Sequence, residues 1–492
     1  MSGPGRRIGA ALRLPVQRGK RIAVVVTVLL LAASAGIGAA LGVPALAGLV
    51  SGAEIAALRT MPPPPPVLPR PALRPALVQG PAPTPAGVAA VLDPLVVQGG
   101  LGRLSGRVVD PGTGSVLWQR YAASPLVPGS TAKLLTASAA LLALDHQARL
   151  RTRVLAGAEP GTVVLVGGGD PTLSTVPAAE NPAAENPAAE NVEDTVYPGA
   201  ARLDDLVRQV RAAAPGPVRR VLVDVGRYAG DALAPGWSRG DVAAGYVAPI
   251  VPVMLDGGRA DPGQAVSPRA GLPAAAAAGE LARRLGADPG AVAVGSAPAG
   301  AAVLGEVASP PVEDLVATVL STSDNVLAEV LAREVALARG AEPSFAGAAA
   351  AVLQVLGAHG FEVTGTILVD GSGLSVRDAV PAALLTDLLA AAAAPDESQH
   401  RTAALRPLLV GLPVAGGSGT LADRYGGSAT AGRGWVRAKT GTLTGVNALA
   451  GTVLDAEGRV LVFALLSNGP DPVAVRPRLD ALAASLQSCG CR

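Results

Sequence analysis

Lysine is the residue that this sequence avoids most clearly. Of its 40 basic residues only three are lysines, Lys20, Lys133 and Lys439, and the rest are arginines. Arginine cannot lose its proton in a protein, whereas a buried lysine can. A lysine that stands where this chain would otherwise have arginine is therefore a candidate for chemistry that needs an amine.

Aromatic residues, cysteine and histidine are scarce as well. The 492 residues include three Trp, five Tyr and three Phe, so the cores of two or three domains must be built mainly from Leu, Val and Ala. The two cysteines and three scattered histidines are too few for a zinc site. Cys489 and Cys491 are compatible with a tight bridge across one residue or with two free thiols.

Strong net charge is also missing, since the formal value is +2. No basic cluster with interleaved aromatics is present, which gives no reason to expect nucleic acid as a partner. The N-terminal basic residues are followed by an uncharged stretch at 22–50. Residues 1–53 are predicted to be a signal peptide or a membrane anchor, and both alternatives place the rest of the chain outside the cytoplasm.

Proline is abundant at 61–87, which favours an extended spacer, predicted at 54–89, with folded structure from about Ala90. Three tandem PAAEN repeats at 177–191 predict a solvated loop, because a proline every five residues prevents a continuous helix. Short strands separated by Gly/Pro turns dominate from about Arg153 to Gly305. This change of character indicates a separate inserted part.

The remaining sequence predicts a mixture of helices and strands. Alternating apolar residues at 105–120 flank Asp-Pro-Gly-Thr-Gly and indicate a hairpin, and the next stretch predicts a buried helix from about Ser130. Residues 312–337 are strongly helical in pattern. The chain ends with consecutive strands that turn at 455–458.

Ser130 and Lys133 are three residues apart at the predicted helix start, so their side chains share a face. A serine hydroxyl needs a base to become a nucleophile, and a lysine can be that base if burial or a like charge lowers its pKa. The alternative for this pair is a capping serine beside a solvated lysine. The three histidines, His146, His359 and His400, offer no competing triad, and we expect them to be structural or exposed.

Two further motifs follow in order: Ser323-Asp324-Asn325 in the helical stretch, and Lys439-Thr440-Gly441-Thr442 near the C-terminus. The ordered set S-x-x-K, S-D-N and K-T-G is typical of penicillin-binding proteins and class A β-lactamases. Both lysines beyond the N-terminal segment fall inside these motifs.

With these motifs, the chain resembles the class C low-molecular-mass penicillin-binding proteins, the PBP4-like peptidase S13 family of D-Ala-D-Ala carboxypeptidases and endopeptidases. The stretches LVGGGDPTLS, LVDGSGLS, GGSGTLADRY and KTGTLTGVNALAG carry the same resemblance, which covers residues 90 to 492. It implies an α+β fold: a β-lactamase-like transpeptidase domain, with an antiparallel sheet flanked by helices, at 90–153 and 305–492. A small β-rich domain or domains at 154–304 would split it.

The resemblance also implies roles for the motif residues. Ser130 would attack a terminal D-Ala–D-Ala bond of a peptidoglycan stem peptide, with Lys133 as its base. Ser323 would relay a proton to the leaving amine, and Asn325 would hold the substrate amide and Lys133. Lys439 would lower the pKa of Lys133.

Three further residues of the K-T-G segment are expected at the substrate site, Thr440, Gly441 and Thr442. The two threonines would bind the substrate carboxylate, and the backbone N–H groups of Ser130 and Thr442 would form an oxyanion hole. Ser372 and Ser418 are expected to be turn residues rather than nucleophiles. The reaction needs no cofactor or metal, and β-lactams would be covalent inhibitors.

Two alternatives remain at this point. A serine β-lactamase or esterase on the same fold shares the acylation machinery and differs in how fast water releases the acyl group. A wall-binding scaffold without activity belongs to a different class, although such a protein has no need to place its rare lysines in these motifs.

Overall fold

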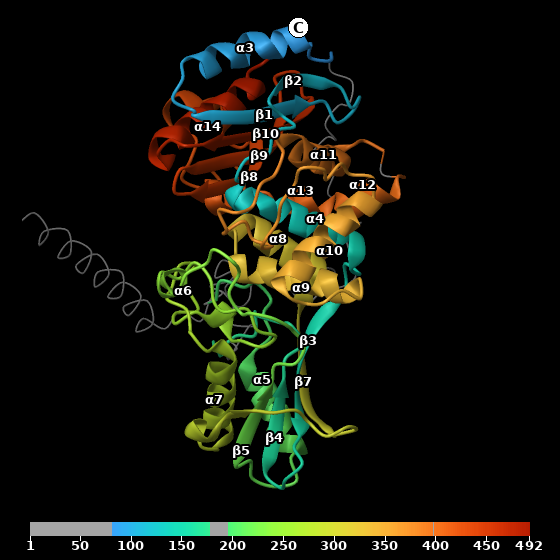
Figure 1. Cartoon of the computed structure of the whole chain (residues 1–492), viewed down its shortest axis with the longest axis vertical. Helices are drawn as coiled ribbons and strands as arrows, with labels where there is room; N and C mark the ends of the chain where they lie inside the picture. Colours follow the sequence, from blue (N-terminus) through green and yellow to red (C-terminus); the bar gives the residue numbers. More distant parts are fainter. Residues whose placement is uncertain (1–80, 178–194, 397) are drawn as a thin grey trace, which may run out of the picture. The chain divides into compact units, whose positions relative to one another are not determined.

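The structure is a computed structural model that describes residues 81–177, 195–396 and 398–492 (Figure 1). The chain divides into two units, Met1–Arg74 and Pro75–Arg492, and every described residue belongs to the second. The predicted leader, most of the proline-rich spacer and nearly all of the tandem repeats lie outside the described residues. Within the described part, no helix combines the length and the apolar character needed to cross a bilayer.

The first sheet has five antiparallel strands in the order β2-β1-β10-β9-β8. β1 and β2 form the predicted hairpin, and the predicted turn at 455–458 joins β9 to β10. The strands are β1 (Arg103–Val109), β2 (Val116–Arg120), β8 (Val436–Leu443), β9 (Val446–Leu454) and β10 (Val460–Asn468).

Helices cover both faces of this sheet (Figure 1). Phe463 of β10 packs with α3 and α14, whereas its neighbour Ala464 packs with the larger helical layer, because successive strand residues point to opposite faces. The helices are α3 (Pro85–Val97), α4 (Lys133–Ala143), α8 (Val312–Thr322), α9 (Asn325–Ala338), α10 (Phe345–Ala358), α11 (Ala382–Ala393), α12 (His400–Leu405), α13 (Pro407–Gly411) and α14 (Pro472–Gln487), with 3₁₀ turns η1 (Gly129–Ala132), η4 (Gly419–Leu421) and η5 (Gly427–Gly432).

Folded structure begins before the predicted Ala90. α3 begins at Pro85, where the side chain of Thr84 accepts the N–H of Gly87 at 3.0 Å. A capping threonine followed by proline is a favourable helix start, since proline lacks an N–H that would be unpaired there. Leu92 of α3 is fully buried against α14. The prediction that the spacer extends to residue 89 was therefore wrong.

The C-terminal residues close onto the same helix. The carbonyl of Cys491 accepts the N–H of Thr84 at 2.6 Å. Cys489 and Cys491 are joined as a disulfide, with Cα atoms 4.9 Å apart, and both side chains are buried in the cluster that contains α3 and α14.

A second five-stranded sheet, of order β6-β5-β4-β3-β7, lies between α4 and α8 in the sequence. β3 pairs antiparallel with β4 and β7, whereas β4, β5 and β6 run parallel. The elements are β3 (Arg149–Ala156), β4 (Thr162–Val166), α5 (Leu203–Ala213), β5 (Arg220–Asp224), α6 (Arg239–Ala243), η2 (Asp256–Gly258), α7 (Pro273–Leu285), η3 (Pro289–Ala291), β6 (Ala293–Val294) and β7 (Val303–Pro311).

β3 and β7 are the outgoing and returning strands of this part. Arg149 is paired with Pro311, so the chain comes back beside the point where it departed. The strands extend beyond the predicted limits of the insertion, 154 and 304. We propose that the inserted part consists of this sheet with α5, α6 and α7, so it contains helices as well as short strands.

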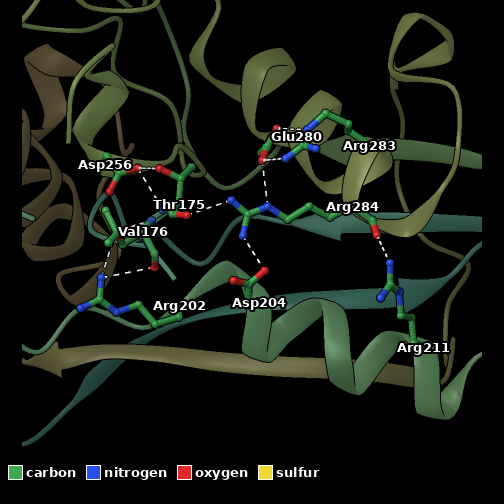
Figure 2. Close-up of polar contacts among 10 residues, drawn as sticks. Thr175, Val176, Arg202, Asp204, Arg211, Asp256, Glu280, Arg283 and Arg284 are labelled. Carbon is green, nitrogen blue, oxygen red and sulfur yellow. Dashed lines mark hydrogen bonds and ion pairs between the residues drawn. The ribbon is translucent and has the colours of Figure 1, made fainter. Parts of the chain in front are cut away.

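Charged side chains connect α5 to α7 within this part (Figure 2). The Arg284 guanidinium donates to Asp204 at 2.6 Å, to Glu280 at 2.8 Å and to the carbonyl of Thr175 at 2.8 Å. Hydrogen bonds from Arg283, with those from Arg284, lower the pKa of Glu280 to about 2. None of these residues lies in the three motifs, so we assign this network to the architecture of the inserted part.

The predicted helix at 312–337 is interrupted in the structure. α8 ends at Thr322, and Ser323 adopts a left-handed conformation with φ of +62°. Asp324 then caps α9 by accepting the N–H of Leu327 at 2.8 Å. A left-handed residue followed by a capping aspartate ends one helix and begins another. The apolar periodicity continues through the break, which is why the sequence pattern concealed it.

Candidate active site

Ser130 and Lys133 lie where η1 becomes α4. The α-helix begins at Lys133, and Ser130 belongs to the preceding 3₁₀ turn rather than to the helix itself. The Lys133 side chain is fully buried, and its amine donates to Ser130 Oγ at 3.0 Å. It also donates to Asn325 Oδ1 at 2.5 Å and to the carbonyl of Ser372 at 2.7 Å. The solvated lysine of the alternative interpretation is thus excluded.

After the break between α8 and α9, Ser323 and Asn325 contact different lysines. Ser323 Oγ accepts from the Lys439 amine at 2.9 Å, while Asn325 contacts Lys133. Asn325 Nδ2 donates to the carbonyl of Tyr246 at 2.9 Å. Because that carbonyl can only accept, it fixes the amide with its oxygen toward Lys133.

Asp324, between these two residues, faces away from the lysines. Its carboxylate accepts from Arg259 at 2.6 Å and from the Tyr197 hydroxyl at 3.0 Å. Burial alone would raise the pKa of Asp324, but the charges of Arg259 and Arg269 outweigh it and lower that pKa to about 2. A buried ion pair thus fixes the turn that presents Ser323 and Asn325.

β8 carries Lys439 to Thr442 along the edge of the first sheet. Lys439 is fully buried and donates to Ser323 Oγ and to the carbonyl of Thr440, each at 2.9 Å. Thr440 Oγ1 donates to Thr420 Oγ1 at 2.9 Å. A side chain on Gly441 would collide with the carbonyl of Pro128, so glycine there lets the strand approach the nucleophile turn.

The close approach brings two backbone N–H groups near one another. A Cβ atom on Gly441 would lie 3.2 Å from the N of Ser130, and one on Gly129 would lie 3.1 Å from the N of Thr442. The turn at 128–130 and the strand at 441–442 are therefore in direct contact.

Burial dominates the acid–base properties of both lysines. It lowers the pKa of Lys133 to about 8, although nearby carboxylates, first Asp370 and then Glu329, oppose the change. Burial also lowers the pKa of Lys439 well below its usual value, and the charge of Lys133 lowers it further. The resemblance implied that Lys439 lowers the pKa of Lys133. In the structure burial is the main cause for both amines, and their mutual repulsion disfavours charging the two together.

A cavity of about 950 Å³ opens onto these residues. The motif residues that line it are Ser130, Ser323, Thr440 and Thr442. Its outer wall includes Tyr246 from the inserted part and Arg476 from α14. The two lysines and Asn325 lie behind this surface rather than in the cavity lining.

Sequence reasoning missed two contributors to the site. The carbonyl of Tyr246 orients Asn325, and nothing in the sequence marks it, because any residue provides a carbonyl. The segment 370–375 contacts Lys133 through Ser372. It lies within LVDGSGLS, a stretch whose sequence indicates the family but gives no catalytic role to any of its residues. Ser372 contributes its carbonyl to the site, which is consistent with the expectation that it shapes the site as a turn residue.

Comparison with known proteins identifies the family of the chain. The model of the D-Ala-D-Ala carboxypeptidase 3 (S13) family matches residues 88–273 and 262–488. The chain is 45% identical over 434 residues to carboxypeptidase Rv3627c of Mycobacterium tuberculosis, covering 87% of this chain and 90% of the relative. It is also 45% identical over 456 residues to carboxypeptidase DacB of Mycolicibacterium smegmatis, covering 91% of this chain and 94% of the relative.

A solved structure has the same fold. Penicillin binding protein 4 of Haemophilus influenzae matches with a TM-score of 0.63 over 82% of this chain and 97% of that chain, at 20% sequence identity. The fold is thus that of the penicillin-binding serine enzymes, as predicted. The chain belongs to the D-Ala-D-Ala carboxypeptidase 3 (S13) family. It is a serine-type D-Ala-D-Ala carboxypeptidase, an enzyme of the cell wall that acts outside the cytoplasm.

The buried pair of Arg259 and Asp324 gives a test of how the second motif is held. Replacing Arg259 with methionine should lower the free energy of unfolding by about 3–5 kcal/mol, because it leaves the Asp324 charge buried without its cation. Urea unfolding measures the change. The double variant Arg259→Met/Asp324→Asn serves as control and should recover most of the loss. A change within about 0.5 kcal/mol in the single variant would contradict the account.

Proposed function

We propose that Ser130 is the nucleophile of this carboxypeptidase and that Lys133 is the base that activates it. The hydrogen bond of 3.0 Å between the fully buried Lys133 amine and Ser130 Oγ is the observation that carries this proposal. A base must lie within hydrogen-bond reach of the proton that it takes and must titrate near the working pH. Burial, which lowers the pKa of Lys133 to about 8, supports the second requirement.

In the proposed first step, Ser130 Oγ forms a bond to the carbonyl carbon of the D-Ala–D-Ala peptide, and its proton passes to Lys133. The carbonyl oxygen, now negative, would accept from the N–H groups of Ser130 and Thr442, an interaction worth about 3 kcal/mol per donor in comparable sites. The peptide C–N bond then breaks, leaving an acyl-enzyme on Ser130 and a free terminal D-Ala.

The leaving amine needs a proton, and in this proposal Ser323 would relay one. Its hydroxyl lies 2.9 Å from the Lys439 amine and lines the cavity beside Ser130. Asn325 would hold both Lys133 and the amide of the substrate. Water then attacks the acyl-enzyme, breaks the ester bond and restores Ser130.

The terminal carboxylate of the substrate would bind at Thr440 and Thr442, with Gly441 allowing the approach. Both hydroxyl-bearing residues line the cavity, and Lys439 lies directly behind Thr440. A carboxylate arriving there favours the charged form of Lys439, because an opposite charge raises the pKa of an amine. Substrate binding would thus supply the countercharge that the buried Lys439 lacks.

We propose peptidoglycan stem peptides ending in D-Ala-D-Ala as substrates and β-lactams as covalent inhibitors at Ser130. The cavity extends beyond Thr442 to α14, where Val473 and Arg476 line it. That extension supports a larger leaving group and hence an additional endopeptidase activity on cross-links. The apolar segment 22–50 would either direct export or anchor the enzyme to the outer face of the cytoplasmic membrane.

Replacing Ser130 with alanine should abolish release of D-Ala from a peptide ending in D-Ala-D-Ala, because the acyl-enzyme cannot form. Chromatographic measurement of free D-Ala gives the rate. Ser418→Ala is the control, since Ser418 also lies in a Gly-rich stretch but its hydroxyl accepts the backbone N–H of Val414 at 3.1 Å. Undiminished release by Ser130→Ala would contradict the proposed nucleophile.

The rate of acylation by a penicillin should rise about tenfold per pH unit below pH 8 and level off above it. The reason is that Lys133 acts in its neutral form and has a lowered pKa of about 8. Stopped-flow fluorescence with a fluorescent penicillin measures this profile. Lys133→Arg should lose acylation at every pH, because arginine stays charged.

Lys439→Arg is the matched control for that profile. It keeps a cation beside Ser323, so a slower acylation with the same rising limb is expected. A wild-type profile that is flat between pH 6 and 9 would contradict Lys133 as the base.

A further inference from the structure

The segment 370–375 lies against both halves of the nucleophile–base pair. The carbonyl of Ser372 accepts from the Lys133 amine at 2.7 Å. Gly373 adopts φ of +75°, and a Cβ atom there would collide with the carbonyl of Gly129, next to Ser130. Any shift of this segment therefore moves an acceptor of the base and presses on the turn that holds the nucleophile.

Glu329 holds the segment from α9. Its side chain is almost completely buried. The N–H of Gly371 donates to its two oxygens at 3.0 and 2.9 Å, and the N–H of Ser372 donates at 2.7 Å. Glu329 is thus bonded to the very residue whose carbonyl holds Lys133.

The position of Glu329 on α9 ties two acceptors of Lys133 together. Asn325 and Glu329 are four residues apart on this helix, so their side chains project from the same face. Asn325 contacts the Lys133 amine directly, and Glu329 contacts it through Ser372. One rigid helix therefore sets two of the three acceptors around the amine, and Ser130 is the third.

Two other side chains also support the segment, and one of them, Asp370, accepts the N–H of Ser372 as well, at 3.2 Å against 2.7 Å for Glu329. Asp370 accepts the N–H groups of Gly373 at 2.6 Å and Ser375 at 2.7 Å, and the indole N–H of Trp237 at 2.8 Å. Thr136 donates to the carbonyl of Gly371 at 2.6 Å. These contacts shape the turn, whereas Glu329 fixes its distance from α9.

We propose that Glu329 is a positioning residue for acylation: by accepting the N–H groups of Gly371 and Ser372, it fixes the Ser372 carbonyl that holds the Lys133 amine against Ser130. This inference rests on the proposed roles of Ser130 and Lys133. It assigns a function to a residue outside the three motifs, and Glu329 itself does not line the cavity that receives substrate.

Glu329 also contributes to the charge around the base. Four carboxyl groups act on Lys133 and raise its pKa against the effect of burial: Asp370, Glu329, Asp324 and Asp378. Four ionisable groups act on or respond to Glu329: Asp370, Lys133, Arg333 and Asp378. Lys439 is a further charged group near the base, and the two amines repel each other when both are charged. Burial raises the pKa of Glu329 itself to about 8, so its carboxyl becomes charged only as the pH rises through that value, and in this charged form it raises the pKa of Lys133.

The test compares Glu329→Gln with Glu334→Gln in acylation by a fluorescent penicillin between pH 6 and 9. Glu334 is a matched control, since it is also a buried glutamate on α9 but bonds to Arg227 and Tyr228 instead. Glutamine at 329 keeps one acceptor oxygen but puts an N–H₂ against the N–H of Gly371, where Glu329 has its second acceptor. We expect its plateau rate to fall about 100-fold, the loss that a misplacement of about 1 Å produces.

The rising limb of the Glu329→Gln profile should also move to lower pH, because the negative charge that Glu329 acquires as the pH rises through its own pKa of about 8 is gone. A general loss of stability would not move the limb. Glu334→Gln should keep both the plateau and the limb of the wild type. Glu329→Asp retains the charge on a shorter side chain, so its limb should stay in place while its plateau falls about tenfold.

Two results would overturn the proposal. One is a Glu329→Gln protein that is acylated like the wild type; the other is an equal loss in the Glu329 and Glu334 variants. If Glu329→Gln does not fold, the aspartate variant decides, and a wild-type plateau there contradicts positioning. Failure of the proposed function can be distinguished from failure of this inference. If the proposed function is wrong, the wild-type protein itself forms no adduct at Ser130.

Discussion

The structure depends on keeping one amine, that of Lys133, fully buried and in contact with a serine hydroxyl. Burial lowers its pKa to about 8, and three acceptors from separate parts of the chain hold it in place. An amine without those acceptors would cost several kcal/mol to bury. With them, a poor base in water becomes one that can take a proton near neutral pH. Arginine cannot lose its proton, so the proposed role as a base accounts for a lysine at this position in a chain that otherwise uses arginine.

The rest of the fold brings those acceptors together across long sequence separations. β3 and β7 return the chain to α8 beside its point of departure, so that α9 can meet α4 despite the residues in between. The insertion also acts on the site directly. The carbonyl of Tyr246 orients Asn325, and Arg259 compensates the buried charge of Asp324. The inserted part is therefore a structural component of the site.

The three motifs can be read directly in the sequence. The hairpin of β1 and β2 and the terminal strands could be predicted because each depends on a short-range pattern. Prediction from the sequence failed where contacts between distant parts of the chain determine the local structure. The break at Ser323 interrupts a continuous apolar periodicity, and only the left-handed backbone shows it. The start of α3 at Pro85 depends on burial against α14 at the other end of the chain. Glu329 gave no signal, since a lone glutamate in a helical pattern is normally solvated.

The most direct test of the central claim is to incubate the purified protein with a penicillin and to measure its intact mass, followed by peptide mapping. The account predicts a lasting adduct of one penicilloyl group on Ser130, and no adduct when Lys133 is replaced by arginine. Rapid turnover of the penicillin without an adduct would instead indicate a β-lactamase on this fold. An adduct on another serine, or full acylation of the Lys133→Arg protein, would contradict the proposed nucleophile and base.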